Sequence, residues 1–132
     1  MSREDFNSSS ILVKDIMIKA LISVNPATTA LQIAKMMEQG GIGAILVKEN
    51  DGLVGIVTDR DFATKIVANN LPFDTPVAKI MSSPLVTINH DVPISAAAEM
   101  MSSKKIRKLA VSDNGNIIGI ITSTDLVNQL AK

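Results

Sequence analysis

The heptapeptide GIVTDRD occupies residues 55–61, and GIITSTD occupies residues 119–125, at an offset of 64 residues. The same offset, without any gap, aligns residues 12–63 with residues 76–127, and 15 of these 52 positions are identical. Chance alone would give about three identities, so a fixed-offset repeat of this strength marks a duplication. The chain therefore contains two copies of one structural unit.

Each copy predicts the element order β-α-β-β-α. A short apolar stretch near residues 21–24 or 85–88 predicts the first strand. The first helix of the first copy has a cap at Thr28 or Thr29 and an end at Gly40-Gly41. A hairpin follows, with its turn at Asp51-Gly52 or Asn114-Gly115. The last helix begins at the Thr of each heptapeptide, and we expect these apolar residues to face inward: Phe62, Ala63, Ile66, Val67, Leu126, Val127, Leu130 and Ala131.

The duplication predicts one α+β module made of tandem β-α-β-β-α repeats. A unit of about 60 residues buries too little apolar surface to stand alone, so we expect the two repeats to pack with pseudo-twofold symmetry. The boundaries predicted are a flexible N-terminal tail at 1–10, a first motif at 11–67, a linker at 68–76 and a second motif at 77–132.

Composition argues against several classes of function. The 13 basic and 13 acidic residues balance, and aromatics make up 2% of the chain, so neither nucleic acid nor a membrane is an expected partner. No cysteine is present and His90 is the single histidine, so no metal site is expected; we predict that His90 is a solvated loop residue. No stretch approaches 18 apolar residues, and a cytoplasmic protein is expected.

The two copies of G-h-h-T-x-x-D (h, apolar), each entering the last helix of a β-α-β-β-α unit, resemble the CBS domain pair, or Bateman module. The resemblance covers the chain from residue 11 onward. It implies two clefts that bind AMP, ADP, ATP or a related adenosine ligand such as S-adenosylmethionine or NAD. It also implies a regulatory protein, similar to free-standing prokaryotic CBS-pair proteins, that forms a homodimer and signals to an unidentified protein partner.

The Thr and Asp of each heptapeptide are the first candidates for ligand contact. An Asp carboxylate offers two acceptor oxygens, which suit the two adjacent hydroxyl donors of a ribose. The Thr lies where the helix begins, beside free backbone N–H groups that favour phosphate. The same T-x-x-D spacing is also a capping box, which would compete with ribose for the Asp. The candidates are Thr58, Asp61, Thr122 and Asp125, with Arg60 and Thr124 at the family position between them.

Further contacts follow from the resemblance. Residues just before the first helix often bind the base or ribose in the family, and those at the start of the second strand hold phosphates. The corresponding residues are Ser23, Val24, Thr87, Ile88, Gly43, Ala44, Arg107 and Lys108. For Val24 and Ile88, an apolar residue buried at a strand end is an equal alternative. We also expect Gly55 and Gly119 to keep the strand low beside the cleft, where a flat base inserts.

The two repeats differ most in charge. KKIRK at 104–108 carries four positive charges, whereas GGIGA at 40–44 carries none. The two sites should therefore differ, with the one that receives Arg107 and Lys108 preferring charged nucleotides. Lys104 and Lys105 have a simpler role as cations at a helix C-terminus.

No nucleophile–base pair can be assembled from this sequence, so we do not expect an enzyme, and no cofactor is required. The alternative to ligand sensing is a ligand-free CBS scaffold for dimerisation or protein–protein interaction. Intact Thr and Asp residues in both copies argue against that alternative.

Overall fold

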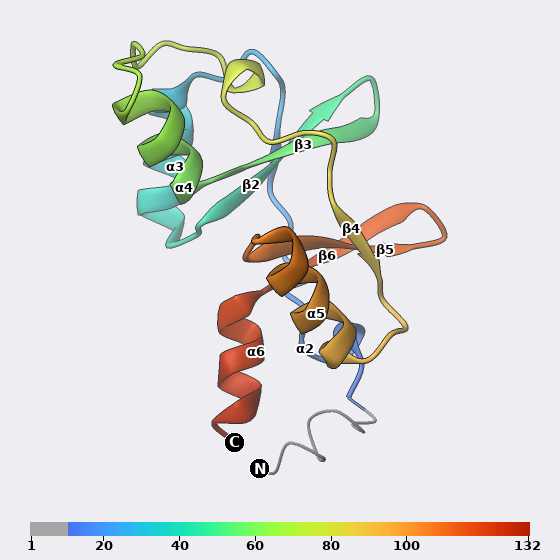
Figure 1. The fold of residues 1–132 in the computed structure, drawn as a ribbon. Coiled ribbons are helices and arrows are strands. Elements are labelled where there is room, and N and C mark those ends of the chain that lie inside the picture. The colour runs from blue at the N-terminus through green and yellow to red at the C-terminus, as the bar shows by residue number, and fades with distance from the viewer. Residues whose placement is uncertain (1–10) are drawn as a thin grey trace. The chain divides into compact units, whose positions relative to one another are not determined.

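The computed structural model describes residues 11–132, so the tail predicted at residues 1–10 lies outside the described residues. The chain forms two compact units. One unit is Ile22–Leu85, and the other joins the chain up to Leu21 to Val86–Lys132. Each unit contains a three-stranded sheet with helices packed on it (Figure 1). The predicted α+β class, with its β-α-β-β-α element order in each half, is confirmed.

The Ile22–Leu85 unit, called unit 2, contains a sheet of order β1-β2-β3. The β1–β2 pair is parallel, and the β2–β3 pair is an antiparallel hairpin. The elements in chain order are β1 (Ser23–Val24), α3 (Ala30–Gly40), β2 (Ala44–Glu49), β3 (Gly52–Thr58), α4 (Asp59–Asp61), the π-helix η1 (Phe62–Val67) and the 3-10 helix η2 (Val77–Lys79).

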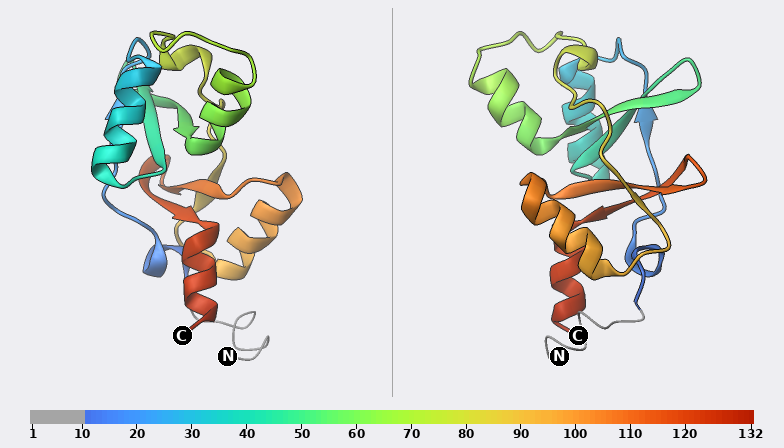
Figure 2. Two further views of the ribbon diagram at one scale, coloured as in Figure 1. Left: turned by 90° about the vertical axis from the view of Figure 1, so that its left-hand side faces the viewer. Right: turned by 45° about the vertical axis from the view of Figure 1, so that its right-hand side comes forward.

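The other unit, called unit 1, repeats this plan with the sheet order β4-β5-β6. Helix α5 packs against this sheet and against α6, and α6 itself contacts the sheet near its start at the end of β6 (Figure 2). The elements in chain order are α2 (Val13–Ile16), β4 (Thr87–Asn89), α5 (Ile94–Lys104), β5 (Lys108–Asp113), β6 (Asn116–Thr122) and α6 (Ser123–Leu130).

Local chemistry sets the ends of α3 as expected. The Thr29 hydroxyl accepts a hydrogen bond from the Gln32 backbone N–H at 3.2 Å. Gly41 ends the helix in the left-handed region, at φ 62°, a conformation that glycine adopts without steric cost. The first hairpin differs slightly from the prediction: its turn is Asn50-Asp51, both at positive φ, and Gly52 already belongs to β3.

Each unit is completed by a segment from the other sequence repeat. In unit 1, the segment after α2 pairs with β6: the Ile18 N–H donates to the Ile120 carbonyl at 2.7 Å, and the reverse bond is 2.9 Å long. In unit 2, Ser82 exchanges the equivalent pair of bonds with Ile56 on β3, at 2.8 and 3.0 Å. We call these two segments, 17–20 and 81–84, the crossing segments. In Figure 1 the first is blue and lies against the red and orange elements of its own unit.

The crossing segments explain the glycines of the two heptapeptides. A Cβ on Gly55 would lie 2.6 Å from the Met81 Sδ and 3.0 Å from the Ser82 carbonyl oxygen. A Cβ on Gly119 would meet Met17 and Ile18 at the same two distances. The prediction that these glycines leave room for a base is wrong, because a methionine and a crossing backbone fill that room.

The last helices bury fewer side chains than predicted. Ile66 and Leu126 are buried and Phe62 is half-buried, but the remaining predicted residues are exposed. In unit 2 the helix continues from α4 as a π-helix, which changes the face that each later residue presents. In unit 1, α6 runs away from its sheet, so only its first turn is covered (Figure 1). The residues wrongly predicted as buried are Ala63, Val67, Val127, Leu130 and Ala131.

Residues 68–76, predicted as a linker, pack within unit 2. Thr75 is 7% exposed, and its carbonyl accepts the Ala30 N–H at 2.8 Å. The Phe73 carbonyl accepts the Leu31 N–H at 3.0 Å. This segment therefore supplies acceptors for backbone N–H groups of the first turn of α3, which have no partner inside the helix.

Candidate functional site

Both T-x-x-D turns have the geometry of a cap. The Thr58 backbone N–H donates to the Asp61 Oδ2 at 2.8 Å, and the Thr122 N–H donates to the Asp125 Oδ2 at 2.9 Å. In the second turn the cap is reciprocal, because the Asp125 N–H donates to the Thr122 hydroxyl at 3.2 Å. Each Asp therefore commits one carboxylate oxygen to its own turn, so the other oxygen is the one to compare between the two turns.

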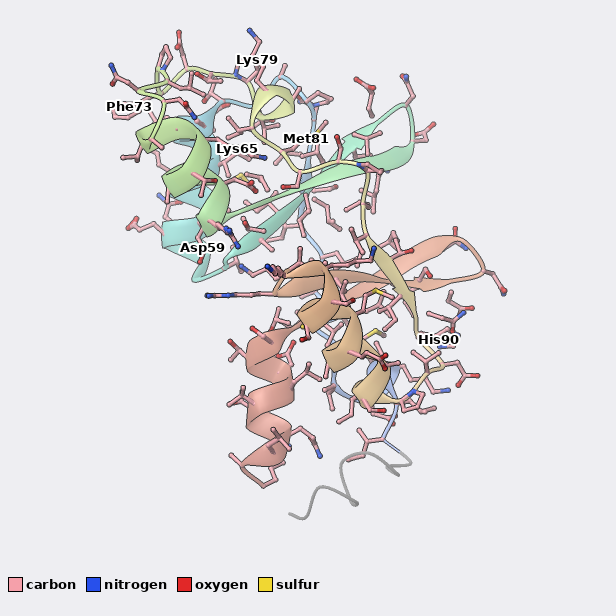
Figure 3. All side chains as sticks on the ribbon, in the orientation of Figure 1. Asp59, Lys65, Phe73, Lys79, Met81 and His90 are labelled. Carbon is pink, nitrogen blue, oxygen red and sulfur yellow. The ribbon has the colours of Figure 1, made fainter. Side chains whose placement is uncertain are left out.

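The second oxygen of Asp61 is already engaged. The Lys65 ammonium lies 3.0 Å from Oδ1, and the Ser82 hydroxyl donates to the same oxygen at 3.2 Å. The Lys65 ammonium also donates to the carbonyls of Ile80 and Met81, at 2.8 and 3.3 Å. Figure 3 shows Lys65 on the helical segment and Met81 on the chain that crosses β3. Asp61 itself is buried, at 5% exposure.

The second oxygen of Asp125 is in a different state. Within residues 11–132, Oδ1 of Asp125 accepts no hydrogen bond and forms no ion pair. The residue itself is half-buried. The two carboxylates, equivalent in sequence, are therefore not equivalent in structure.

The starts of β2 and β5 lie beside these turns, as the resemblance implies. In unit 1, Lys108 is the cross-strand partner of Thr122, and the Arg107 carbonyl accepts the Ser123 N–H at 2.8 Å. Arg107 is exposed and Lys108 is half-buried. This arrangement places two cationic residues next to the first residues of α6, where backbone N–H groups also favour an anion.

In unit 2 the same positions carry no charge. Ala44 is the cross-strand partner of Thr58, and the Gly43 carbonyl accepts the Asp59 N–H at 3.3 Å. The charge difference between the repeats thus falls directly at the two turns. Arg60 and Thr124, within the turns, are both exposed.

The residues before the first helices do not join the turns within their units. Ser23 and Val24 pair with Leu46 and Val47, one strand away from β3. They line an open depression of about 570 Å³, together with Asn25, Ala27, Thr28, Gln32 and Met36, which does not include the T-x-x-D turn. In unit 1, Thr87 is exposed, whereas Ile88 is 6% exposed and belongs to the core. Ile88 is therefore an apolar residue buried at a strand end, which was the alternative to ligand contact.

His90 is more constrained than predicted. The residue is labelled in Figure 3. Its ring is 22% exposed, and Nε2 lies 3.3 Å from the Asp113 Oδ1. His90 does lie in a turn, as predicted, but it is half-buried rather than solvated, and β5 brings Asp113 alongside it. Residues 11–132 contain no group of three His, Cys, Asp or Glu side chains placed to hold a metal ion. Among the same residues, every helix is too short or too polar to cross a lipid bilayer.

Sequence reasoning missed Lys65 and Ser82. Lys65 follows Asp61 by four residues, a spacing that places both side chains on one helix face, so this half of the contact could have been found. Ser82 comes from the crossing segment, and no local pattern predicts its approach to Asp61.

Comparison with protein families gives two matches of one model, described as CBS domain, at residues 13–68 and 77–132. A curated relative, the CBS domain-containing protein YhcV of Bacillus subtilis, is 38% identical over 90% of this chain and 86% of its own length. Another, the uncharacterised protein MK0525 of Methanopyrus kandleri, is 37% identical, but the chain spans only 62% of its length.

Solved structures give the same fold. A conserved protein from Pyrococcus horikoshii superposes with a TM-score of 0.87 at 30% identity, covering 92% of both chains. The CBS domain pair of the protein MJ0100, solved in complex with 5′-methylthioadenosine and S-adenosylmethionine, gives a TM-score of 0.83 at 30% identity, covering 92% of this chain and 96% of that one. A putative signal-transduction protein with CBS domains from Burkholderia ambifaria gives 0.81 at 31% identity, over 85% and 83%.

Proposed function

Because this chain belongs to the CBS domain family and carries two CBS domains, we propose that it is a regulatory module that binds an adenosine-containing ligand and does not catalyse a reaction. Membership confirms the resemblance drawn from the two G-h-h-T-x-x-D motifs. The ligand class is supported by MJ0100, a protein of the same fold that was crystallised with two adenosine derivatives. The regulated protein partner belongs to the proposal as well, and its identity is open.

The observation that carries the proposal is the T-x-x-D turn of unit 1. Asp125 holds its turn with one carboxylate oxygen and leaves the other available, at a half-buried position. A ribose has two adjacent hydroxyl donors, and a charged acceptor oxygen binds such donors more strongly than a neutral one. Asp125 is therefore the ribose-binding residue of the proposed site.

The phosphate or other anionic part of a ligand would lie toward Arg107 and Lys108. Lys108 is opposite Thr122 in the hairpin, and Arg107 is bonded through its carbonyl to Ser123. Guanidinium and ammonium groups beside a helix N-terminus bind anionic oxygens well. This geometry favours AMP, ADP or ATP over adenosine.

Thermal unfolding tests the proposal. The protein would be heated with AMP, ADP, ATP, adenosine, S-adenosylmethionine, 5′-methylthioadenosine and NAD, with GTP as the control for the base. A ligand at a hundred times its Kd stabilises the folded state by about 2.7 kcal/mol. We expect a rise in Tm with at least one adenine compound and none with GTP. Folded protein with no response across the whole panel would refute the proposal.

A second function, self-association, is favoured by the exposed apolar side chains of α6. Val127 is 61% exposed and Leu130 is 48% exposed, although both are apolar and three residues apart on one helix face. We expect the chain to form a homodimer that covers such residues. Sedimentation velocity would test this, with Val127→Asp expected to shift the protein toward monomer.

A further inference from the structure

We infer that the two T-x-x-D turns have diverged, so that only Asp125 binds ribose, while Lys65 and Ser82 close the equivalent carboxylate of Asp61. The contacts Lys65–Asp61 and Ser82–Asp61 are here called the clasp. This inference rests on the proposed function and adds a stoichiometry to it: one adenosine ligand per chain at the turns.

The clasp and the Thr58 cap together occupy all the acceptor sites that the Asp61 carboxylate would offer a ribose. Oδ2 accepts from the Thr58 backbone N–H at 2.8 Å and from its hydroxyl at 3.3 Å. Oδ1 accepts from Lys65 at 3.0 Å and from Ser82 at 3.2 Å. A carboxylate has about four lone-pair sites, two on each oxygen, so two donors on each oxygen leave none for a ligand.

Displacing the clasp would take from Lys65 its charged partner and leave it with neutral acceptors. The Lys65 ammonium binds four acceptors, which are the Asp61 carboxylate, two backbone carbonyls and the Ser82 hydroxyl at 3.4 Å. The Asp61 side chain is 7% exposed and that of Lys65 is 36% exposed, so separating these two charges costs more than at a fully exposed site. Two ribose hydroxyls, which are neutral donors, do not compensate for the loss of a charged one.

The second repeat lacks both clasp residues. At the offset of 64 residues, Lys65 corresponds to Gln129 and Ser82 corresponds to Ile18. Glutamine carries no charge to pair with Asp125, and isoleucine has no donor. The backbone frame is nevertheless the same, because Ile18 exchanges hydrogen bonds with β6 as Ser82 does with β3. Two side chains therefore distinguish a closed turn from an open one.

Isothermal titration calorimetry on the full chain tests the inference, with AMP, ATP and S-adenosylmethionine as separate probes. We expect wild type to bind one equivalent per chain, Asp125→Asn to weaken binding at least tenfold, and Asp61→Asn to change it less than threefold. Two equivalents for wild type, or loss of binding in folded Asp61→Asn alone, would overturn the inference.

Two exchange variants keep the test decisive if Asp61→Asn does not fold. Lys65→Gln with Ser82→Ile gives unit 2 the residues of unit 1, and a second equivalent of probe should bind. Ile18→Ser with Gln129→Lys builds the clasp onto Asp125, and binding should fall at least tenfold. If stoichiometry and affinity stay unchanged in both variants, the clasp does not control the sites. If no probe binds the wild type at all, the proposed function itself fails, a result distinct from both.

Discussion

Replacing Gly55 with alanine should destabilise the protein, because the added methyl group would enter the space of the crossing segment. The new Cβ would lie 2.6 Å from the Met81 Sδ and 3.0 Å from the Ser82 carbonyl oxygen. The methionine side chain can rotate away, but the carbonyl belongs to a backbone that is hydrogen-bonded to Ile56 in both directions. The substitution must therefore move the crossing segment away from β3.

Three contributions set the size of the effect. Overpacking a well-packed site costs about 1–3 kcal/mol, and weakening the two bonds between Ser82 and Ile56 costs about 1 kcal/mol more. Restricting the unfolded chain, as any Gly→Ala change does, returns about 0.5 kcal/mol. The net prediction is a loss of about 1.5–3.5 kcal/mol in the free energy of unfolding.

Urea denaturation would measure this loss, with Gly52→Ala as the matched control. Gly52 begins the same strand, and the nearest atom to its added Cβ is the Glu49 carbonyl oxygen at 3.7 Å, an ordinary contact. The control should therefore lie within about 0.5 kcal/mol of wild type. Equal stabilities for the two alanine variants would refute the argument that the crossing segment requires glycine.

Three further predictions concern stability and are measured by urea denaturation. Asp61→Asn should cost about 2 kcal/mol, because it weakens the cap and also removes the charged partner of Lys65, whereas Asp125→Asn should cost about 1 kcal/mol for the weakened cap alone; equal losses would contradict the clasp. Thr29→Ala should lower the free energy of unfolding by about 1 kcal/mol, because it removes the cap of α3. An unchanged free energy of unfolding would show that this cap does not stabilise the protein. Ile121→Ala should cost about 2–5 kcal/mol, since this side chain is fully buried; Val67→Ala, at a position 76% exposed, is its control and should change stability by less than about 0.5 kcal/mol.

The features that sequence predicted well depend on neighbours along the chain. The ends of α3 follow from Thr29 and Gly41, whose effects act within one helical turn. The capping geometry of the T-x-x-D turns has the same local origin. The duplication supported the predicted element order, because the same β-α-β-β-α pattern occurs in both repeats at one offset.

The features that sequence missed depend on distant contacts. The burial of the last helices could not be predicted because the π-helical winding of η1 and the limited reach of the sheet under α6 come from packing. The clasp was not predicted for a related reason: Ser82 reaches Asp61 only when the crossing segment is hydrogen-bonded to β3. The roles of Gly55 and Gly119 were misread because a glycine in a strand predicts close approach without naming what approaches.

The way in which the chain is divided between the two units has a consequence for synthesis on the ribosome. Unit 2 is contiguous, from Ile22 to Leu85, so all of its contacts are available once that segment has emerged. Unit 1 joins Ile18 to Ile120, partners that are made about a hundred residues apart. At roughly 5–20 residues per second, the early segment waits for several seconds before its partner strand exists. The chain is thus expected to acquire its structure from the middle outward, with the segment around Ile18 among the last to find its place.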